Sequence, residues 1–394
     1  MAIPRQKKYQ GPALFSYGFR PFFLFGSLYS GLSVVLWLPL FYGELELASE
    51  FAVVDWHIHE MFFGFLAAVV TGFLFTAVPN WTGRMPIVGT PLLLLFLLWM
   101  AGRAAVTFSS YIGWIPAMII DLLFLAAIMG VLANEVIAGK NWRNLKVLLP
   151  LGLLLAANAG FHLEAHYTGV SDISRRLAMA AAILLIMIIG GRVIPSFTRN
   201  WLVRENPGRL PVPFNRYDLI AIAFSAVALG TWVILDTGFA TGYLMAAAAG
   251  FQIIRLFRWA GDRTLREPLV TVLHLSYFFI PIGFTLLALS SFAPDFFSPL
   301  VGIHALSIGA VGGMTLSVML RATLGHSGQA LTTGIIAKAV FVSIFLAAIF
   351  RIIAEFDESR FDIWLHFSAL TWFLAFVGFG ITFAPLFLKQ KSRP

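Results

Sequence analysis

The 394-residue sequence contains no cysteine, and only 12% of its residues are charged. Without cysteine the chain cannot form disulfides or thiolate-ligated clusters, so a soft metal would need histidine or methionine ligands. Hydrophobic residues make up 59% of the chain, which is a composition typical of proteins embedded in a bilayer. The shortage of charge also argues against a large water-exposed domain.

The apolar residues fall in long runs, and a helix needs about 20 mostly apolar residues to cross a bilayer. The runs are Phe19–Gly43, Trp56–Val78, Pro91–Ser109, Ile112–Val136, Leu145–Tyr167, Leu177–Ile194, Leu219–Leu235, Gly242–Phe257, Leu269–Phe292, Phe297–Leu320, Leu331–Ile353 and Phe361–Phe387. The longest connection is Trp201–Tyr217. We therefore predict an all-α, polytopic membrane helix bundle of about twelve transmembrane helices, forming a single integral membrane domain over residues 1–394.

Charges between the runs predict the orientation. Basic residues fall on one side of the predicted bundle: Arg5, Lys7, Lys8, Arg84, Lys140, Arg143, Lys146, Arg199, Arg204, Arg209, Arg216, Arg258, Arg263, Arg266, Lys389, Lys391 and Arg393. The opposite connections are mostly acidic, with Arg175 and Arg176 as the exception. The positive-inside rule then places both termini in the cytoplasm. The net charge of +8 thus reflects topology, and the expected partner is the lipid bilayer, with no nucleic acid.

Three runs, the second, sixth and tenth, end in related sequences. Asn80-Trp81 and Asn200-Trp201 are separated by four runs, and so are the pairs Gly190-Gly191 and Gly312-Gly313. This spacing predicts three repeated four-helix units. The alternative is that Gly, Pro and Trp are simply common at helix ends and interfaces.

Ionisable residues inside membrane spans are costly and often functional. In a helix His57 and His59 would point to nearly opposite faces, because each residue turns the chain by about 100°. His162 and His166 would share a face, and with Glu164 they could form a metal or proton site. Histidines at span ends also serve as interfacial hydrogen-bonding groups. Two carboxylates on the fourth run, Asp121 and Glu135, could join a proton relay if they lay at hydrogen-bonding distances.

A repeat of four helices would bring the second and tenth runs around a common centre. His57 or His59 could then face His304, and two facing histidines suit axial ligation of a haem in a dry bundle interior. Copper is the other candidate, because imidazole and thioether ligands suit it and Met61 and Met314 lie on the same runs. Each methionine could equally be a packing residue.

A second set of candidates lies toward the predicted cytoplasmic side. Arg20, Arg84, Arg192 and Arg321 fall near His274 and His326. Arginines can pair with haem propionates or an anionic substrate, and the two histidines could form a second, inner site. The alternative for the arginines is that they extend to the lipid headgroups.

Several motifs are similar to those of the NnrS family. They are GFRPFFL at Gly18–Leu24, WHIHEMFFGF at Trp56–Phe65, TAVPNWTG at Thr76–Gly83, GGRVIPSFT at Gly190–Thr198, and the segment from His304 through Arg321 to His326. The resemblance covers nearly the whole chain. It implies a bacterial inner-membrane protein that contains haem and copper and is linked to nitric oxide and nitrosative stress.

The resemblance also implies site residues. The family's histidines correspond to His57, His59, His162, His274, His304 and His326, and its arginines to Arg20, Arg192 and Arg321. These positions would bind haem, of the b type, and copper. His166 and His366 lie outside the family motifs.

Three functions follow as hypotheses. The first is a haem- and copper-binding protein that binds or reduces nitric oxide at a histidine-ligated centre, as a membrane-bound oxidoreductase supplied with electrons by quinol or a redox partner. The second is a secondary transporter or a haem or metal carrier, which twelve spans and internal repetition would also suit. The third is an accessory factor without turnover. A bound chromophore would separate the first from the second.

Overall fold

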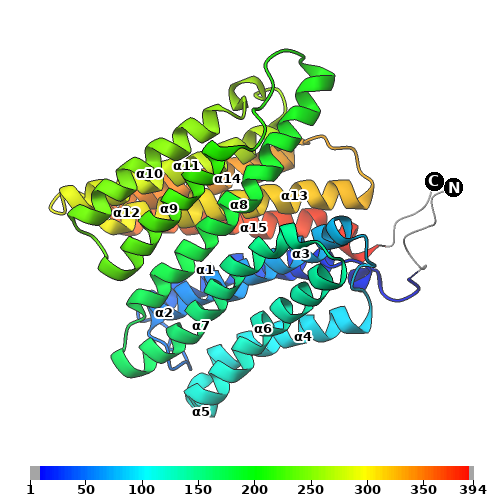
Figure 1. Ribbon diagram of the computed structural model, residues 1–394. Coiled ribbons are helices and arrows are strands. Elements are labelled where there is room, and N and C mark those ends of the chain that lie inside the picture. Colours follow the sequence, from blue (N-terminus) through cyan, green and yellow to red (C-terminus); the bar gives the residue numbers. More distant parts are fainter. Residues whose placement is uncertain (1–8, 390–394) are drawn as a thin grey trace. The chain divides into compact units, whose positions relative to one another are not determined.

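The computed structural model describes residues 9–389, apart from the side chain of Arg143. In this part of the chain all regular structure is helical, and twelve helices are long and apolar enough to cross a membrane (Figure 1). The chain is thus an integral membrane protein with an all-helical fold, as predicted. Arg5, Lys7, Lys8, Lys391 and Arg393, which contribute to the predicted orientation, lie outside the described residues.

Helices are the expected outcome for these apolar runs, because a backbone in lipid must satisfy its hydrogen bonds within the segment. Nine spans are single helices: α1 (Phe19–Phe41), α4 (Thr90–Thr107), α6 (Trp114–Ala138), α8 (Asp172–Glu205), α9 (Arg216–Leu235), α10 (Phe239–Phe257), α11 (Pro268–Phe292), α14 (Ile335–Ala354) and α15 (Phe361–Leu388). The fifth is α7 (Leu148–Thr168), which follows the 3₁₀ turn η3 (Trp142–Val147). Shorter elements are η1 (Ala13–Phe15), α5 (Ser109–Ile112), η4 (Gly261–Arg263) and η6 (Glu358–Arg360).

The second and tenth spans share an unusual feature. Each contains a π-helical segment that begins directly after a histidine. The second span consists of α2 (Val53–His59), the π-helix η2 (Glu60–Leu66) and α3 (Ala67–Thr82), and the tenth of α12 (Pro299–His304), the π-helix η5 (Ala305–Gly312) and α13 (Gly313–Ser327). Such wide turns are rare and occur frequently at functional sites. They single out His59 and His304 among the histidines.

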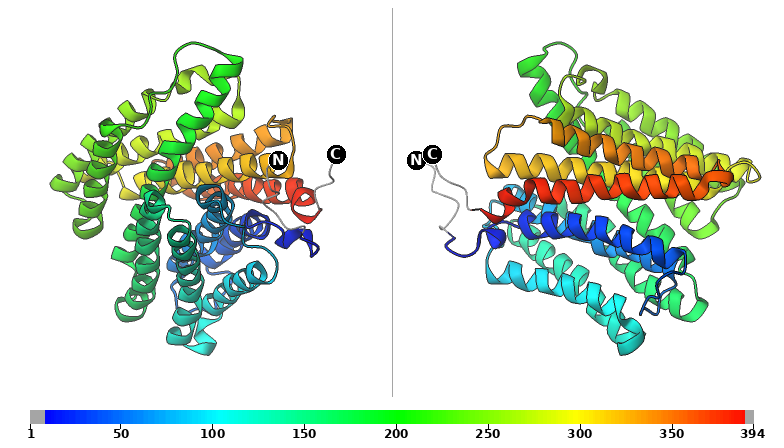
Figure 2. Two further views of the ribbon diagram at one scale, coloured as in Figure 1. Left: turned by 45° about the vertical axis from the view of Figure 1, so that its right-hand side comes forward. Right: turned by 180° about the vertical axis from the view of Figure 1, so that it is seen from behind.

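The described chain packs as two compact units, drawn in Figure 2 from two further sides. Unit 1 contains residues 9–175, 319–330 and 376–389, and unit 2 contains residues 176–318 and 331–375. In unit 1, α1 packs on α3, and α6 packs on α4 and α7. In unit 2, α10 packs between α9 and α11, and η5 packs on α11 and α14. The single domain and the three repeated four-helix units remain predictions.

One boundary differs from the expectation. The predicted loop Trp201–Tyr217 is partly helical, because α8 continues to Glu205 and α9 already begins at Arg216. Hydropathy marks only the part of a helix that lies in lipid, and the helical backbone continues beyond it. The helix ends before Asn206, because a residue that precedes a proline, here Pro207, disfavours helical backbone angles. Asn215 then caps α9 by accepting a hydrogen bond from the backbone of Tyr217.

Candidate functional site

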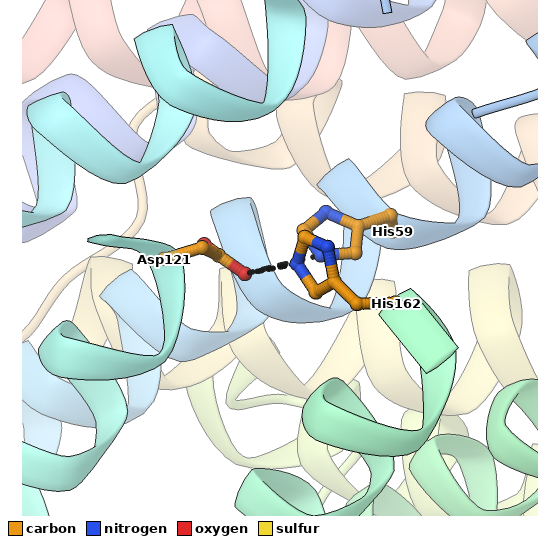
Figure 3. A group of neighbouring side chains, drawn as sticks. All are labelled: His59, Asp121 and His162. Carbon is orange, nitrogen blue, oxygen red and sulfur yellow. Dashed lines mark hydrogen bonds and ion pairs between the residues drawn. The ribbon is translucent and has the colours of Figure 1, made fainter. Parts of the chain in front are cut away.

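A buried group of metal-ligating side chains lies within unit 1. His59 comes from the end of α2, Asp121 from α6 and His162 from α7, and one ligand atom from each lies within 4.8 Å of the others. Asp121 Oδ2 lies 3.1 Å from His59 Nε2 and 3.3 Å from His162 Nε2 (Figure 3). All three side chains are buried. Two imidazoles and a carboxylate thus converge inside the bundle.

Both ring nitrogens of His59 face hydrogen-bond acceptors. Nδ1 lies 3.0 Å from Glu60 Oε1, and Nε2 lies 3.0 Å from Asn158 Oδ1 in addition to Asp121 Oδ2. Asn158 also donates through Nδ2 to Asp121 Oδ2 at 2.8 Å, which fixes its amide oxygen toward His59. A neutral imidazole carries only one N–H, so it can donate to one of these sides only. The arrangement therefore calls for a cation at His59, either a second proton or a metal ion.

Arg103 on α4 holds two carboxylates at once. Its Nη1 donates to both oxygens of Glu60, at 2.6 and 2.7 Å, and its Nη2 donates to Asp121 Oδ1. Tyr29 on α1 donates its hydroxyl to Glu60 Oε2. Glu60 is fully buried, and Asp121 and Arg103 expose only 2% and 6% of their surface. One guanidinium balances one of two buried carboxylates, so with neutral histidines the group keeps one negative charge.

Two glycines make room for this group. A Cβ on Gly64 would lie 2.8 Å from Glu60 Oε2 and 2.9 Å from Arg103 Nη1, and one on Gly102 would lie 3.0 Å from Asp121 Oδ1. The backbone oxygen of Gly64 also accepts from Trp99 Nε1 at 2.9 Å. The π-helix η2 carries both Glu60 and Gly64, and helix α4 packs against it.

Aromatic rings enclose His59. The centroid of its imidazole lies 4.8 Å from the ring centroid of Phe63, 4.9 Å from that of Phe51 and 5.3 Å from that of Phe161. The His162 ring lies 5.2 Å away at an interplanar angle of 79°. These contacts make the surroundings of the group apolar, and in a low dielectric its ionic interactions are stronger than in water.

Three other candidate residues from the same helices or their ends, His57, Glu164 and His166, lie outside this buried group. His57 stacks on Trp37 of α1, so it faces a different neighbour from His59. His166 is exposed and stacks on Trp114, while Glu164 accepts from the backbone of Ser174 at the start of α8. The expected site of His162 with His166 and Glu164 stays a prediction. The structure places Glu164 as a cap at the start of α8 and His166 on the surface, whereas His162 is buried.

The remaining histidines divide between the units. His304, half-buried in unit 2, places Nδ1 2.8 Å from the backbone oxygen of Leu300. His274, buried in unit 2, lies against Thr198. His326, exposed in unit 1, has Tyr17 and Phe19 as ring neighbours. The pairings of His57 or His59 with His304 and of His274 with His326 each join the two units and stay predictions.

The four arginines named as candidates from the sequence have different surroundings. Arg20 is buried and donates to the backbone oxygens of Ala13, Phe387 and Lys389, so it caps the end of α15. Arg84 pairs with Glu135 at 2.6 Å, and this hydrogen bond raises the pKa of the Arg84 guanidinium. Glu135 lies fourteen residues from Asp121 on the same helix α6, which is about 21 Å at 1.5 Å per residue, so the two cannot share a hydrogen bond. Arg192 and Arg321 are half-buried, as is Met61, whereas Met314 is buried.

Sequence reasoning missed four members of the buried group. They are Glu60, Arg103, Asn158 and Tyr29. A signal existed for Glu60 and Arg103, because they are charged residues inside the second and third apolar runs, where charge is costly. The other two are common residue types in membrane helices, and their positions carry no comparable signal.

Comparison with known families gives a match over nearly the whole chain. A family model described as NnrS protein matches residues 13–391. A comparison with curated proteins gives no match.

Proposed function

The chain belongs to the NnrS family, and we propose that it is a metal-dependent protein of the bacterial inner membrane that binds or converts nitric oxide. The proposed centre is the group of His59, Asp121 and His162. Family membership supports the link to nitric oxide, and the buried histidine and carboxylate ligands support the metal.

The observation that carries the proposal is the arrangement of acceptors around His59. In the tautomer that donates Nδ1–H to Glu60, Nε2 is the nitrogen with a lone pair in the neutral ring. This lone pair faces a carboxylate oxygen and an amide oxygen. Three electron-rich atoms that face one another repel, unless a cation lies among them. A carboxylate that fixes the tautomer of a ligating histidine is a common support of metal sites.

The two distances from Asp121 to the histidines suit a single small ion. Metal–nitrogen and metal–oxygen bonds of about 2.0–2.1 Å separate neighbouring ligand atoms by about 2.9 Å in a square arrangement and by about 3.3 Å in a tetrahedral one. Asp121 Oδ2 lies 3.1 and 3.3 Å from the two imidazole nitrogens. The residual negative charge of the group would be offset by the cation. Imidazole and carboxylate ligands fit copper in its oxidised form, and copper is the ion we propose.

A haem does not fit this position. Phe51, Phe63 and Phe161 pack directly on the ring of His59. A porphyrin would have to displace these rings. We therefore place the proposed b-type haem at histidines outside the group, among His57, His274, His304 and His326. Arg20, Arg192 and Arg321 are the candidates for its propionates.

The chain's own residues would position the ligands and exclude water. Arg103 holds Glu60 and Asp121 in place, Asn158 orients the Asp121 oxygen, and the aromatic rings keep the group dry. A bound copper ion would supply an open coordination position for a diatomic gas. Reduction of nitric oxide would also need electrons, which we assign to quinol or a redox partner. The charge distribution supports cytoplasmic termini.

The test is to purify the protein in detergent and to measure copper, iron and visible spectra before and after addition of nitric oxide. We expect copper to be lost in His59→Ala and in His162→Ala. The matched controls are His57→Ala on the same span as His59 and His166→Ala on the same helix as His162, and both should keep copper.

Other outcomes select another function. A preparation that is colourless and free of metal despite adequate haem and copper during expression would reject the proposal and favour a transporter. Metal that is bound but does not respond to nitric oxide would favour a carrier or an accessory factor. Equal copper in all four variants would show that copper is bound outside the His59 group.

A further inference from the structure

Two guanidiniums share one buried carboxylate at the end of α10. Arg255 Nε donates to Asp218 Oδ1 at 3.0 Å, and Arg258 Nη2 lies 3.4 Å from Asp218 Oδ2. Within residues 9–389, Asp218 is the carboxylate that forms an ion pair with either guanidinium. Arg255 is fully buried, whereas 21% of the Arg258 side chain is exposed. The group therefore keeps one positive charge, and Arg258 carries that charge to the surface.

The two guanidiniums differ in how many of their N–H groups find acceptors. Arg255 Nη1 also donates to the hydroxyl of Tyr277 at 2.7 Å and to the backbone oxygen of Met187 at 3.2 Å. In the described part of the chain, Arg258 donates only the long hydrogen bond to Asp218, and its Nε has no partner. A guanidinium has five N–H donors. Arg258 thus retains the capacity to bind an oxyanion.

A row of aromatic rings runs from Arg258 along the seam between α9 and α10, which pack side by side (Figure 1). The Arg258 guanidinium lies over the ring of Tyr217, 4.7 Å from its centroid. The rings of Tyr217 and Phe251 lie 6.2 Å apart, and those of Phe251 and Phe224 lie 5.0 Å apart. All three rings are half-buried. Tyr217, Phe251 and Phe224 are called the aromatic row below.

Helical spacing explains why these side chains line up. Tyr217 and Phe224 are seven residues apart on α9, and Phe251 and Arg258 are seven residues apart at the end of α10. Seven residues make about two helical turns, so each pair lies on one face of its helix, separated by about 10 Å along the axis. The hydroxyl of Tyr217 donates to the backbone oxygen of Phe251 at 2.8 Å, which joins the two helices within the row.

Exposed apolar side chains lie beside the aromatic row. Leu219 and Ile220 on α9, and Ile254 and Phe257 on α10, are each more than half exposed. Large apolar residues that stay exposed on a membrane-spanning helix contact the acyl chains of lipids. The seam thus combines a cation at the end of two spans with an apolar surface that extends from it toward the middle of the spans.

We propose that this seam binds a phospholipid with an anionic headgroup, whose phosphate pairs with Arg258 and whose acyl chain lies along the aromatic row. A guanidinium offers parallel N–H donors to two phosphate oxygens. The unbalanced positive charge favours an anionic headgroup over a zwitterionic one. Basic sites between spans on the cytoplasmic side recognise such headgroups, and the charge distribution of the chain predicts that α10 ends on that side.

The proposed lipid site goes beyond the proposed function. All its residues belong to unit 2, whereas the proposed metal centre belongs to unit 1. Copper content reports on the metal centre and lipid binding reports on the seam, so failure of one proposal is distinguishable from failure of the other.

The experiment is native mass spectrometry of the full-length protein in detergent, titrated with phosphatidylglycerol or with phosphatidylcholine of the same acyl chains. We expect phosphatidylglycerol to bind more tightly. Arg258→Gln should weaken its binding about fivefold or more, as expected for the loss of one cation at an anionic lipid surface. The matched control is Arg204→Gln at the end of α8, which removes the same charge from an exposed arginine and should bind as the unaltered protein does.

Further variants separate the cation from the ring beneath it. Arg258→Lys keeps the charge but loses the paired donors, so phosphatidylglycerol binding should fall less than in Arg258→Gln. Tyr217→Leu removes the ring under the guanidinium and should weaken binding, whereas Tyr217→Phe keeps the ring and should retain it. These variants also test the site should Arg258→Gln fail to fold, and thermal unfolding of each sample reports whether the protein is folded.

Three results would overturn the proposal. The first is equal affinity for phosphatidylglycerol and phosphatidylcholine in the unaltered protein. The second is unchanged phosphatidylglycerol binding in folded Arg258 and Tyr217→Leu variants. The third is full displacement of bound phosphatidylglycerol by inorganic phosphate, which would show a site for a free anion in place of a lipid site.

Discussion

Arg103 places its Nη1 2.6 and 2.7 Å from the two carboxylate oxygens of Glu60, joining helix α4 to the π-helical turn of the second span. The same guanidinium donates through Nη2 to Asp121 on α6. One buried cation therefore organises both carboxylates of the candidate centre, and its removal would leave two negative charges inside the membrane bundle.

Arg103→Gln should destabilise the protein by about 3–5 kcal/mol, the usual cost of removing one partner from a buried ion pair. Chemical unfolding in detergent micelles would measure the change. Arg84→Gln is the control, because Arg84 pairs with Glu135 at a more exposed position and its loss should leave unfolding unchanged. Equal effects of the two substitutions would contradict a buried ionic group around Arg103.

Gly64→Ala should destabilise the fold by about 1–3 kcal/mol, because the new methyl group would crowd Glu60 and Arg103. Copper binding should fall as well, since Glu60 would shift away from His59. Gly130→Ala on α6 is the matched control. Nothing lies within 4 Å of a Cβ there, and the substitution should stabilise the helix by about 0.5–1 kcal/mol. Retained copper and stability in Gly64→Ala would show that the close packing at Gly64 does not support the centre.

Asp121→Asn should abolish copper binding while the protein still folds. The amide keeps the size of the side chain but loses the charge and one acceptor, and Glu60 remains to balance Arg103. Metal analysis and thermal unfolding of the same sample would separate the two effects. Asp172→Asn is the control, because its exposed ion pair with Arg175 lies outside the group. A folded variant that keeps its copper would show that Asp121 is not a ligand. A variant that unfolds would show that the Asp121 carboxylate is needed for the fold, against the expectation.

Asp357 lies between α14 and α15, outside the membrane spans, and its contacts lead us to expect that the stability of the fold depends on pH. Its carboxylate accepts from Trp364 Nε1 at 3.0 Å and from Ser359 Oγ at 2.7 Å, and these hydrogen bonds lower its pKa. A carboxyl group with a lowered folded-state pKa stabilises the fold above its unfolded-state pKa, and this stabilisation is lost as the pH falls through the folded-state value.

Asp357→Asn should therefore make stability less dependent on pH in the acid range, measured as the unfolding temperature between mildly acidic and neutral pH. Asp295→Asn, at another connection between spans, offers a comparison. If the acid sensitivity of the Asp357→Asn variant equals that of the unaltered protein, the hydrogen bonds of Asp357 do not contribute.

The spans and their number followed from hydropathy, but some boundaries did not. The helix α8 runs past the apolar run Leu177–Ile194 to Glu205. Hydropathy reports where a chain prefers lipid, and helical hydrogen bonding continues where the chain meets water. The π-helical turns after His59 and His304 also had no counterpart in the sequence pattern.

The candidate centre was predicted only in part. His59 and His162 were both singled out, yet His59 was paired with the tenth span and His162 with His166. The structure instead joins them to each other through Asp121. Helical periodicity can tell which residues of one helix share a face and which do not, as it does for His57 and His59, which point in different directions. It cannot tell which face of another helix lies opposite.

The sequence by itself determined that this protein is an all-helical membrane protein, because in lipid each long apolar run must satisfy its backbone hydrogen bonds locally. The motifs of the chain also determined its family. Only the tertiary structure decided that Arg103, Asn158 and Tyr29 surround His59, and that Thr198 orients His274. These contacts join residues from different helices, and they depend on how the helices pack, which no local pattern of residues encodes.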